Sequence, residues 1–123
     1  MFILLFITSL IVPAIMVGFG LLWRKRPPRS INSLYGYRTS WSQKSKETWE
    51  FAHKYIAKIW LYIGIPLGVI TIVLFFVFHN ISDDALLEFI YAITFIQTII
   101  LLLTIIPTEI ELRKKFDKNG NRK

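Results

Sequence analysis

The sequence predicts an all-α integral membrane protein with three transmembrane helices and a cytoplasmic loop that carries an interfacial amphipathic helix. Three segments of 22 or more residues are almost free of charge: Phe2 to Trp23, about Ile56 to Phe78, and Ala85 to Pro107. A helix rises about 1.5 Å per residue, so each segment forms a helix about 33 Å long that crosses a bilayer. All 15 Lys and Arg residues lie between the first two segments, just inside the second, or after the third.

The distribution of these basic residues predicts the topology. None precedes the first span, and none lies in the turn from His79 to Asp84. The N-terminus is therefore expected outside and the C-terminus in the cytoplasm. The 123 residues are expected to form one domain, with a signature loop at 24–55 and a basic tail at 108–123. Anionic headgroups account for the net charge of +7, so the lipid bilayer is the expected partner and direct nucleic-acid binding is not expected.

The first span, 2–23, carries signals for bending, packing and termination. Pro13 near its middle frees one backbone carbonyl and bends the helix. Ala14 and Gly18 form a small-xxx-small pair that predicts a close helix contact. Trp23 is an interfacial anchor, and the basic residues after it stop translocation. No basic region precedes the span, so we expect it to remain as a helix and not to act as a signal peptide.

The second span is preceded by a predicted amphipathic helix. Ser45 is a suitable N-cap, and an acidic residue follows in the first turn. The apolar and aromatic side chains from Trp49 to Trp60 form one stripe, which we expect to lie in the headgroup layer before the chain turns inward. Within the span at 56–78, a Gly64-x-x-x-Gly68 pattern encloses a proline and predicts a close contact with a kink.

The third span, 85–107, contains the intramembrane polar residues. Thr94 and Gln97 share a helical face with Tyr91 and Thr98. An amide without a partner in hydrocarbon costs several kcal/mol, so Gln97 is expected to face another helix. An interhelical hydrogen bond is the preferred interpretation, and a ligand contact is the alternative. Beyond this span, the end of the basic tail, 117–123, is expected to be disordered.

The loop at 24–55 contains the candidate binding residues. Gly36 allows a tight turn between two aromatic residues, and the guanidinium of Arg38 can hold a carboxylate, a phosphate or several carbonyls. The motif is completed by polar and aromatic side chains that can close over this turn: Asn32, Tyr37, Thr39, Trp49 and His53. One interpretation is a cytoplasmic-face pocket for an anionic or peptide ligand. The other is structural: Arg38 ties the loop to helix ends, through Glu109 or Glu111.

These motif residues resemble the signature of the SdpI family of bacterial membrane proteins. The resembling pattern is Asn32-x-x-x-Gly36-Tyr37-Arg38-Thr39, nine further residues, then Trp49-Glu50-Phe51-Ala52-His53. The resemblance is sharp over about 27–58 and generic in the flanking spans. It implies a bacterial cell-membrane protein that confers immunity to a secreted peptide toxin. It also implies signalling, in which a small cytosolic repressor is held at the membrane when toxin is present.

Other functional classes remain as alternatives or are disfavoured. A small scaffold that recruits a cytosolic partner is the main alternative. Transport would require an oligomer formed through the small-residue faces, so oligomerisation remains open. No catalytic motif is present, and no enzymatic activity, cofactor or metal is expected. His79 beside Asp83 and Asp84 matches no metal-ligand spacing.

Overall fold

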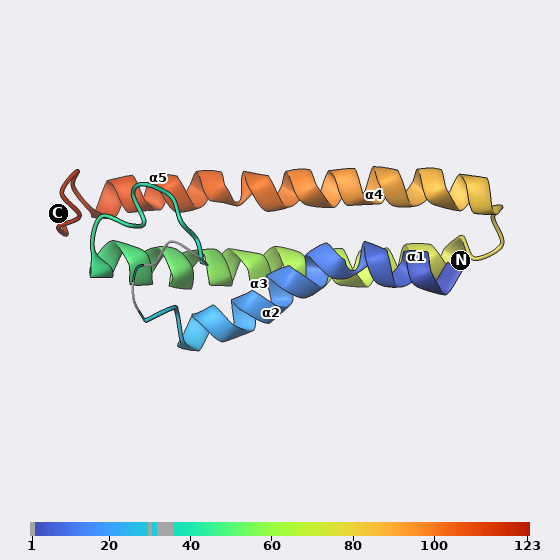
Figure 1. The fold of residues 1–123 in the computed structure, drawn as a ribbon, viewed down its shortest axis with the longest axis horizontal. Helices are drawn as coiled ribbons and strands as arrows, with labels where there is room; N and C mark the ends of the chain where they lie inside the picture. The colour runs from blue at the N-terminus through green and yellow to red at the C-terminus, as the bar shows by residue number, and fades with distance from the viewer. Residues whose placement is uncertain (1, 30, 32–35) are drawn as a thin grey trace.

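A computed structural model describes residues 2–29, 31 and 36–123, and Figure 1 shows its three long helical rods side by side. The first rod contains α1 (Phe2–Ser9) and α2 (Ile11–Lys25). The second is α3 (Lys46–Val77), and the third contains α4 (Asp83–Leu103) and α5 (Ile105–Lys115). All three rods are long and apolar enough to cross a membrane, which agrees with the expected fold class. The two chain termini lie at opposite ends (Figure 1).

The first rod is interrupted at Leu10, between α1 and α2. Pro13 lies one turn beyond the interruption and has no N–H to donate to the carbonyl of Ser9. The carbonyl of Leu10 still accepts the backbone N–H of Ala14 at 2.8 Å, so the helix resumes immediately. The freed Ser9 oxygen must be satisfied from another element, as the sequence predicted for a mid-span proline.

The second rod, α3, contains both the amphipathic segment and the second span without a break. Ser45 is the N-cap and forms a capping box with Thr48, in which each side chain accepts the other residue's backbone N–H. The chain does not turn in the headgroup layer, because no glycine or proline interrupts the helix before Gly64. The aromatic stripe therefore packs on protein, with Trp49, Ala52, His53 and Ile56 fully buried.

The third rod extends beyond the predicted end of the span. The interruption at Thr104 starts a new helix, and Pro107 falls in the first turn of α5, where a backbone N–H has no intrahelical partner to lose. The helix therefore continues to Lys115 and includes half of the expected tail. The remainder is folded and not disordered as expected: Phe116 and Arg122 form an antiparallel bridge, and Phe116 is fully buried.

The packing of α2 on α3 depends on two glycines. A Cβ at Gly20 would lie 2.8 Å from Cγ of Leu61, and one at Gly64 would lie 2.9 Å from Cβ of Met16. These positions therefore set the close approach of the two helices. The expected Ala14–Gly18 contact is absent from the described structure, because Gly18 has open space where its Cβ would be.

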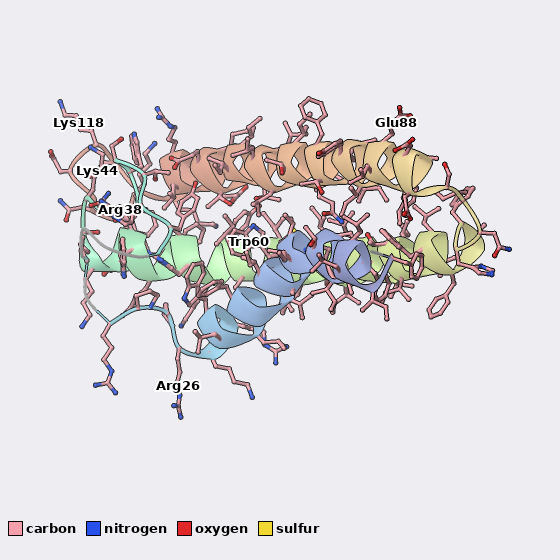
Figure 2. All side chains as sticks on the ribbon, turned by 45° about the vertical axis from the view of Figure 1, so that its right-hand side comes forward. Arg26, Arg38, Lys44, Trp60, Glu88 and Lys118 are labelled. Atoms are coloured by element: carbon pink, nitrogen blue, oxygen red, sulfur yellow. The ribbon has the colours of Figure 1, made fainter. Side chains whose placement is uncertain are left out.

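The charged residues divide the bundle into two unlike ends (Figure 2). We call the end formed by 24–58 and 109–123 the basic end, and the end formed by the 78–88 region the acidic end. Arg26, Arg38, Lys44 and Lys118 lie at the basic end in Figure 2, whereas Glu88 lies at the acidic end. Between the two ends the rods expose large apolar side chains, such as Phe76 and Phe95, which are 69% and 68% exposed. A bilayer covers such surfaces, and the chain is a multi-pass membrane protein.

Candidate functional site

Three of the signature residues, Gly36, Tyr37 and Trp49, gather around the imidazole of His53 at the basic end. His53 is completely buried, one turn after Trp49 on α3. Its ring lies 4.4 Å from the Trp49 ring and 4.8 Å from the Trp23 ring, measured between centroids. Gly36 and Tyr37 of the loop complete the group, because the Tyr37 ring packs edge-on against the imidazole at 6.4 Å. We call Trp23, Gly36, Tyr37, Trp49 and His53 the loop cluster.

Both ring nitrogens of His53 are engaged in hydrogen bonds. Nδ1 lies 2.7 Å from the carbonyl oxygen of Trp49, and Nε2 lies 2.8 Å from the backbone N of Tyr37. A carbonyl only accepts and a backbone N–H only donates, so the proton is on Nδ1 and Nε2 accepts. A proton on Nε2 would face the N–H of Tyr37 and break this contact. His53 is therefore a neutral imidazole, and its hydrogen bond with Tyr37 attaches the loop to α3.

A glycine is required at position 36, where the loop crosses the rings of His53 and Trp49. Its φ angle of +107° lies in the region that side chains with a Cβ rarely adopt. A Cβ built there would lie 2.8 Å from Nε2 of His53 and 3.2 Å from the Trp49 ring. The tight turn expected at this glycine is therefore present, and its cause is close packing on the loop cluster.

Tyr37 links the loop to the third rod. Its hydroxyl donates to Oε1 of Glu109 on α5 at 2.9 Å. Burial and the neighbouring carboxylate raise the pKa of the Tyr37 hydroxyl, so it remains a protonated donor. One of the two interpretations of the sequence tied the loop to helix ends through Arg38 and Glu109 or Glu111. The structure shows a tie to Glu109 from the adjacent tyrosine, which the sequence interpretation did not consider for this role.

Trp49 joins the same cluster to the segment that follows α2. Its indole Nε1 donates to the carbonyl oxygen of Pro28 at 2.8 Å, in a fully buried contact. Trp49 was also considered as an interfacial anchor, but its side chain is completely buried and cannot reach the membrane interface. With Trp23 from α2 against the imidazole, the loop cluster connects the first rod, the loop and the second rod.

The turn after Tyr37 is held by Thr39 and Ser42. The Ser42 hydroxyl accepts the Thr39 backbone N–H at 3.0 Å and lies 2.9 Å from the Tyr37 carbonyl oxygen, to which it can donate. The Thr39 hydroxyl accepts the Ser42 backbone N–H at 3.2 Å. Ser42 is fully buried, and the sequence interpretation missed it. The Thr-x-x-Ser spacing is the signal that could have identified this reciprocal turn.

Arg38 lines a pocket of about 330 Å³ beside the loop cluster. Its other walls come from the loop and from all three rods: Trp23, Gly36, Tyr37, Thr39, Ile56, Trp60, Leu101, Leu102 and Ile105. Apart from the loop residues, these walls are apolar or aromatic. The pocket is therefore lined by one guanidinium and by mainly hydrophobic side chains. Asn32, the remaining signature residue, lies outside the described residues.

Gln97 forms a second site, in the membrane-spanning part of the third rod. Its side-chain nitrogen donates to the Ser9 carbonyl at 3.0 Å and to the Thr71 hydroxyl at 3.1 Å, and the residue is 1% exposed. The carbonyl that Pro13 frees is thus satisfied by Gln97, and one amide ties all three rods. Its Oε1 is buried without a hydrogen-bond partner among the described residues. The interhelical hydrogen bond predicted from the sequence is present.

The other polar residues predicted on this face do not join Gln97. Thr94 is only partly buried, while Thr98 is exposed and donates to the Thr94 carbonyl of its own helix at 2.8 Å. Tyr91 is 70% exposed. Side chains three or four positions apart spread over a wide arc of the helix, so only one of the four faces the bundle interior.

The end of the chain is a further part of the basic end that the sequence interpretation missed. Ser45 donates to the Gly120 carbonyl at 2.7 Å, and Lys44 donates to the Lys118 carbonyl at 2.7 Å. Gly120 has a φ angle of +81°, and a Cβ there would lie 2.9 Å from Cβ of Ser45. The short Asn-Gly-Asn segment around this position is the turn signal that could have indicated order.

Comparisons with known proteins agree with the resemblance seen in the motif. The model of the SdpI/YfhL protein family matches residues 29–108, well over half of the chain. An uncharacterized protein, YfhL of Bacillus subtilis (strain 168), is 36% identical over 61 residues. That alignment covers 50% of this chain and 56% of the relative, so the chain matches little more than half of the relative's length. No solved structure matches.

Proposed function

The chain belongs to the SdpI/YfhL protein family, and on that premise we propose that it protects a bacterial cell membrane from a secreted, membrane-active peptide. The family match includes every residue of the loop cluster except Trp23, and it includes the two spans that follow the loop. In this proposal the N-terminus and the acidic end face outward, and the basic end faces the cytoplasm. The one-sided distribution of Lys and Arg supports that orientation.

The observation that carries the proposal is the convergence of Gly36, Tyr37 and Trp49 on His53. The loop is attached to α3 through His53 and through Trp49, which binds Pro28 at the start of the loop, and it is attached to α5 through Tyr37. A peptide that alters the packing of the spans would therefore change the attachment of the loop. This coupling supports signalling through the loop to a cytosolic repressor or another regulator.

The acidic end supplies the surface that an external peptide would meet first in this orientation. Asp83, Asp84 and Glu88 are exposed there, and no Lys or Arg lies near them in the sequence. Gln97 then connects all three rods farther along the bundle. We propose that peptide contact at the acidic end shifts the rods relative to one another and so acts on the loop cluster.

The proposal is tested by survival of a sensitive bacterium exposed to a secreted membrane-active peptide. We expect the wild-type chain to protect, and Tyr37→Phe to protect less, because it removes the contact between the loop and α5. Tyr91→Phe is the matched control, because that hydroxyl is exposed on α4. All variants are compared at equal membrane abundance. Absence of protection by the wild-type chain would refute the immunity proposal.

Arg38→Ala separates two locations for peptide recognition. Loss of protection at equal abundance would support the pocket below Arg38 as the functional site. Retained protection would move recognition to the spans or to the acidic end. Crosslinking of the loop with and without peptide tests the signalling step, and an unchanged crosslinking pattern would contradict it.

The second candidate function is a membrane scaffold that recruits a cytosolic protein. The observation that favours it is the joint surface formed by the loop and the folded tail, where Lys44 and Ser45 hold 118–120. Arg122 reinforces this junction by lying 3.9 Å from the Glu47 carboxylate. Capture of one specific cytosolic protein, without resistance to any peptide, would favour this candidate over immunity.

A further inference from the structure

A groove between α2 and α3 combines three cations with an apolar floor. It has a volume of about 540 Å³, within the range of small-molecule sites. Arg24 contributes from α2, and Lys54 and Lys58 contribute from α3. The floor is formed by four apolar or aromatic side chains: Leu21, Leu61, Tyr62 and Ile65. This groove is separate from the loop cluster and from the pocket below Arg38.

The polarity of the groove changes along its length in the same order on both helices. On α3, Lys54 and Lys58 are one turn apart, and Leu61, Tyr62 and Ile65 follow on the same face toward the bilayer centre. On α2, Arg24 lies at the end of the helix and Leu21 lies one turn deeper. A ligand in this groove therefore meets positive charge at its outer end and hydrocarbon-like surface farther in.

The three cations are available to an anionic group. Each is exposed, and within the described chain none of them lies within 4.0 Å of a carboxylate. No acidic residue lines the groove, although Lys54 also borders the neighbouring hollow that contains Glu47 and Glu50. The apolar floor also remains uncovered by protein, because Tyr62 is 73% exposed and Ile65 is 52% exposed.

The depth of this groove is fixed by close helix packing. Gly20 on α2 would place a Cβ 2.8 Å from Leu61, so the absence of a side chain there brings the two helices together beneath the groove. Leu61 is thereby held as part of the floor. The groove is therefore a preformed feature of the α2–α3 contact and does not depend on the loop.

We propose that this groove binds one anionic phospholipid, such as phosphatidylglycerol, at the basic end of the bundle. The phosphate lies among Arg24, Lys54 and Lys58, and an acyl chain follows Tyr62 and Ile65 toward the bilayer centre. Charge complementarity selects the anionic headgroup, and the apolar floor selects a lipid over a soluble phosphate. The site requires no peptide toxin, so it stands independently of the proposed immunity function.

The test is native mass spectrometry of the purified full chain titrated with phosphatidylglycerol or phosphatidylcholine. We expect one phosphatidylglycerol to bind preferentially. The triple variant Arg24→Gln, Lys54→Gln, Lys58→Gln should lose most of this preference, at about fivefold in affinity per cation removed. The matched control removes three exposed positive charges elsewhere at the basic end: Lys114→Gln, Lys115→Gln and Lys118→Gln. It should retain the preference.

Three further measurements complete the test. The conservative variant Lys54→Arg, Lys58→Arg should bind as the wild type does, and circular dichroism should show equal helix content in all variants. Excess glycerol 3-phosphate should not displace the bound lipid. Equal binding of both lipids, an equal loss in the control triple variant, or displacement by glycerol 3-phosphate would each overturn the proposal.

Discussion

Replacing Gly36 with alanine tests the packing of the loop on the loop cluster. The glycine has a φ angle of +107°, and its missing Cβ would lie 2.8 Å from Nε2 of His53. His53 and Trp49 are both completely buried, so neither ring can move aside without disturbing its own hydrogen bonds. We therefore expect Gly36→Ala to detach the loop from α3 while the three rods remain folded.

The cost of this substitution is the sum of two effects. A residue with a Cβ held at this backbone conformation costs about 1–3 kcal/mol. Overpacking a filled interior costs about 1–3 kcal/mol more. At about 1.4 kcal/mol per factor of ten, even a total of about 2 kcal/mol raises the population of the detached loop about 30-fold.

Hydrogen–deuterium exchange at the Tyr37 amide measures this population, because that amide donates to buried His53 at 2.8 Å. Gly36→Ala should accelerate its exchange about 30-fold or more. Gly18→Ala is the matched control, since a Cβ at Gly18 meets nothing within 4 Å. Exchange at Tyr37 that is equally slow in wild type and Gly36→Ala would refute the packing described for the loop.

Three further predictions concern the ties between the rods. Tyr37→Phe should destabilise the fold by about 1 kcal/mol at neutral pH. Burial and the nearby carboxylate raise the Tyr37 pKa above its ordinary 10.0. The hydroxyl's contribution to stability is therefore complete below pH 10.0 and is lost progressively as the pH rises from there toward the raised pKa, so the difference in thermal stability between wild type and Tyr37→Phe should narrow above pH 10.0. A constant difference would contradict this. Gln97→Leu should lower the free energy of unfolding by about 1 kcal/mol. The loss should be smaller in a Pro13→Ala background, because the backbone N–H of the new alanine can then bind the Ser9 carbonyl. Additive losses in the double-mutant cycle would argue against a role of Gln97 in binding that carbonyl. Gly64→Ala should lower the free energy of unfolding by about 1–3 kcal/mol, whereas Gly18→Ala should leave it unchanged. Equal effects of the two substitutions would contradict the packing of α2 on α3.

Much of the architecture follows directly from the sequence. The three spans are fixed by long apolar segments, and the start of α3 by the N-cap at Ser45. The interhelical role of Gln97 could be predicted because an amide in hydrocarbon needs a partner. Pro13 indicated that a carbonyl would be freed. The amide of Gln97 binds the Ser9 carbonyl that Pro13 frees. This contact depends on the packing of α1 against α4, which neither segment specifies alone.

Other features depend on how the helices rotate against one another. Gly20 and Gly64 make the close contacts, whereas the equally small Ala14 and Gly18 face outward. Spacing places residues on one face of a helix but does not select the face that packs inward. The third rod was expected to end at Pro107, but the helix breaks three residues earlier, at Thr104, and then resumes. The same spacing separates the break at Leu10 from Pro13, so each proline interrupts its rod without ending it.

The loop shows the same limit at the level of single side chains. The sequence identified Gly36, Trp49 and His53 as neighbours in a closed turn, and the structure brings them together. It did not identify Tyr37 as the residue that reaches α5, because a tyrosine next to an arginine is the less obvious partner for a carboxylate. The order of the tail likewise depends on contacts between segments that lie more than 70 positions apart in the sequence.

The most direct test of the proposed protection is survival of a sensitive bacterium that expresses the chain during exposure to a secreted membrane-active peptide. Wild type, Gly36→Ala and Gly18→Ala are compared at equal membrane abundance against cells without the chain. We predict protection by wild type and Gly18→Ala, with loss of protection in Gly36→Ala. Equal survival of cells with and without the chain, or full protection by Gly36→Ala, would contradict a function that depends on the loop cluster.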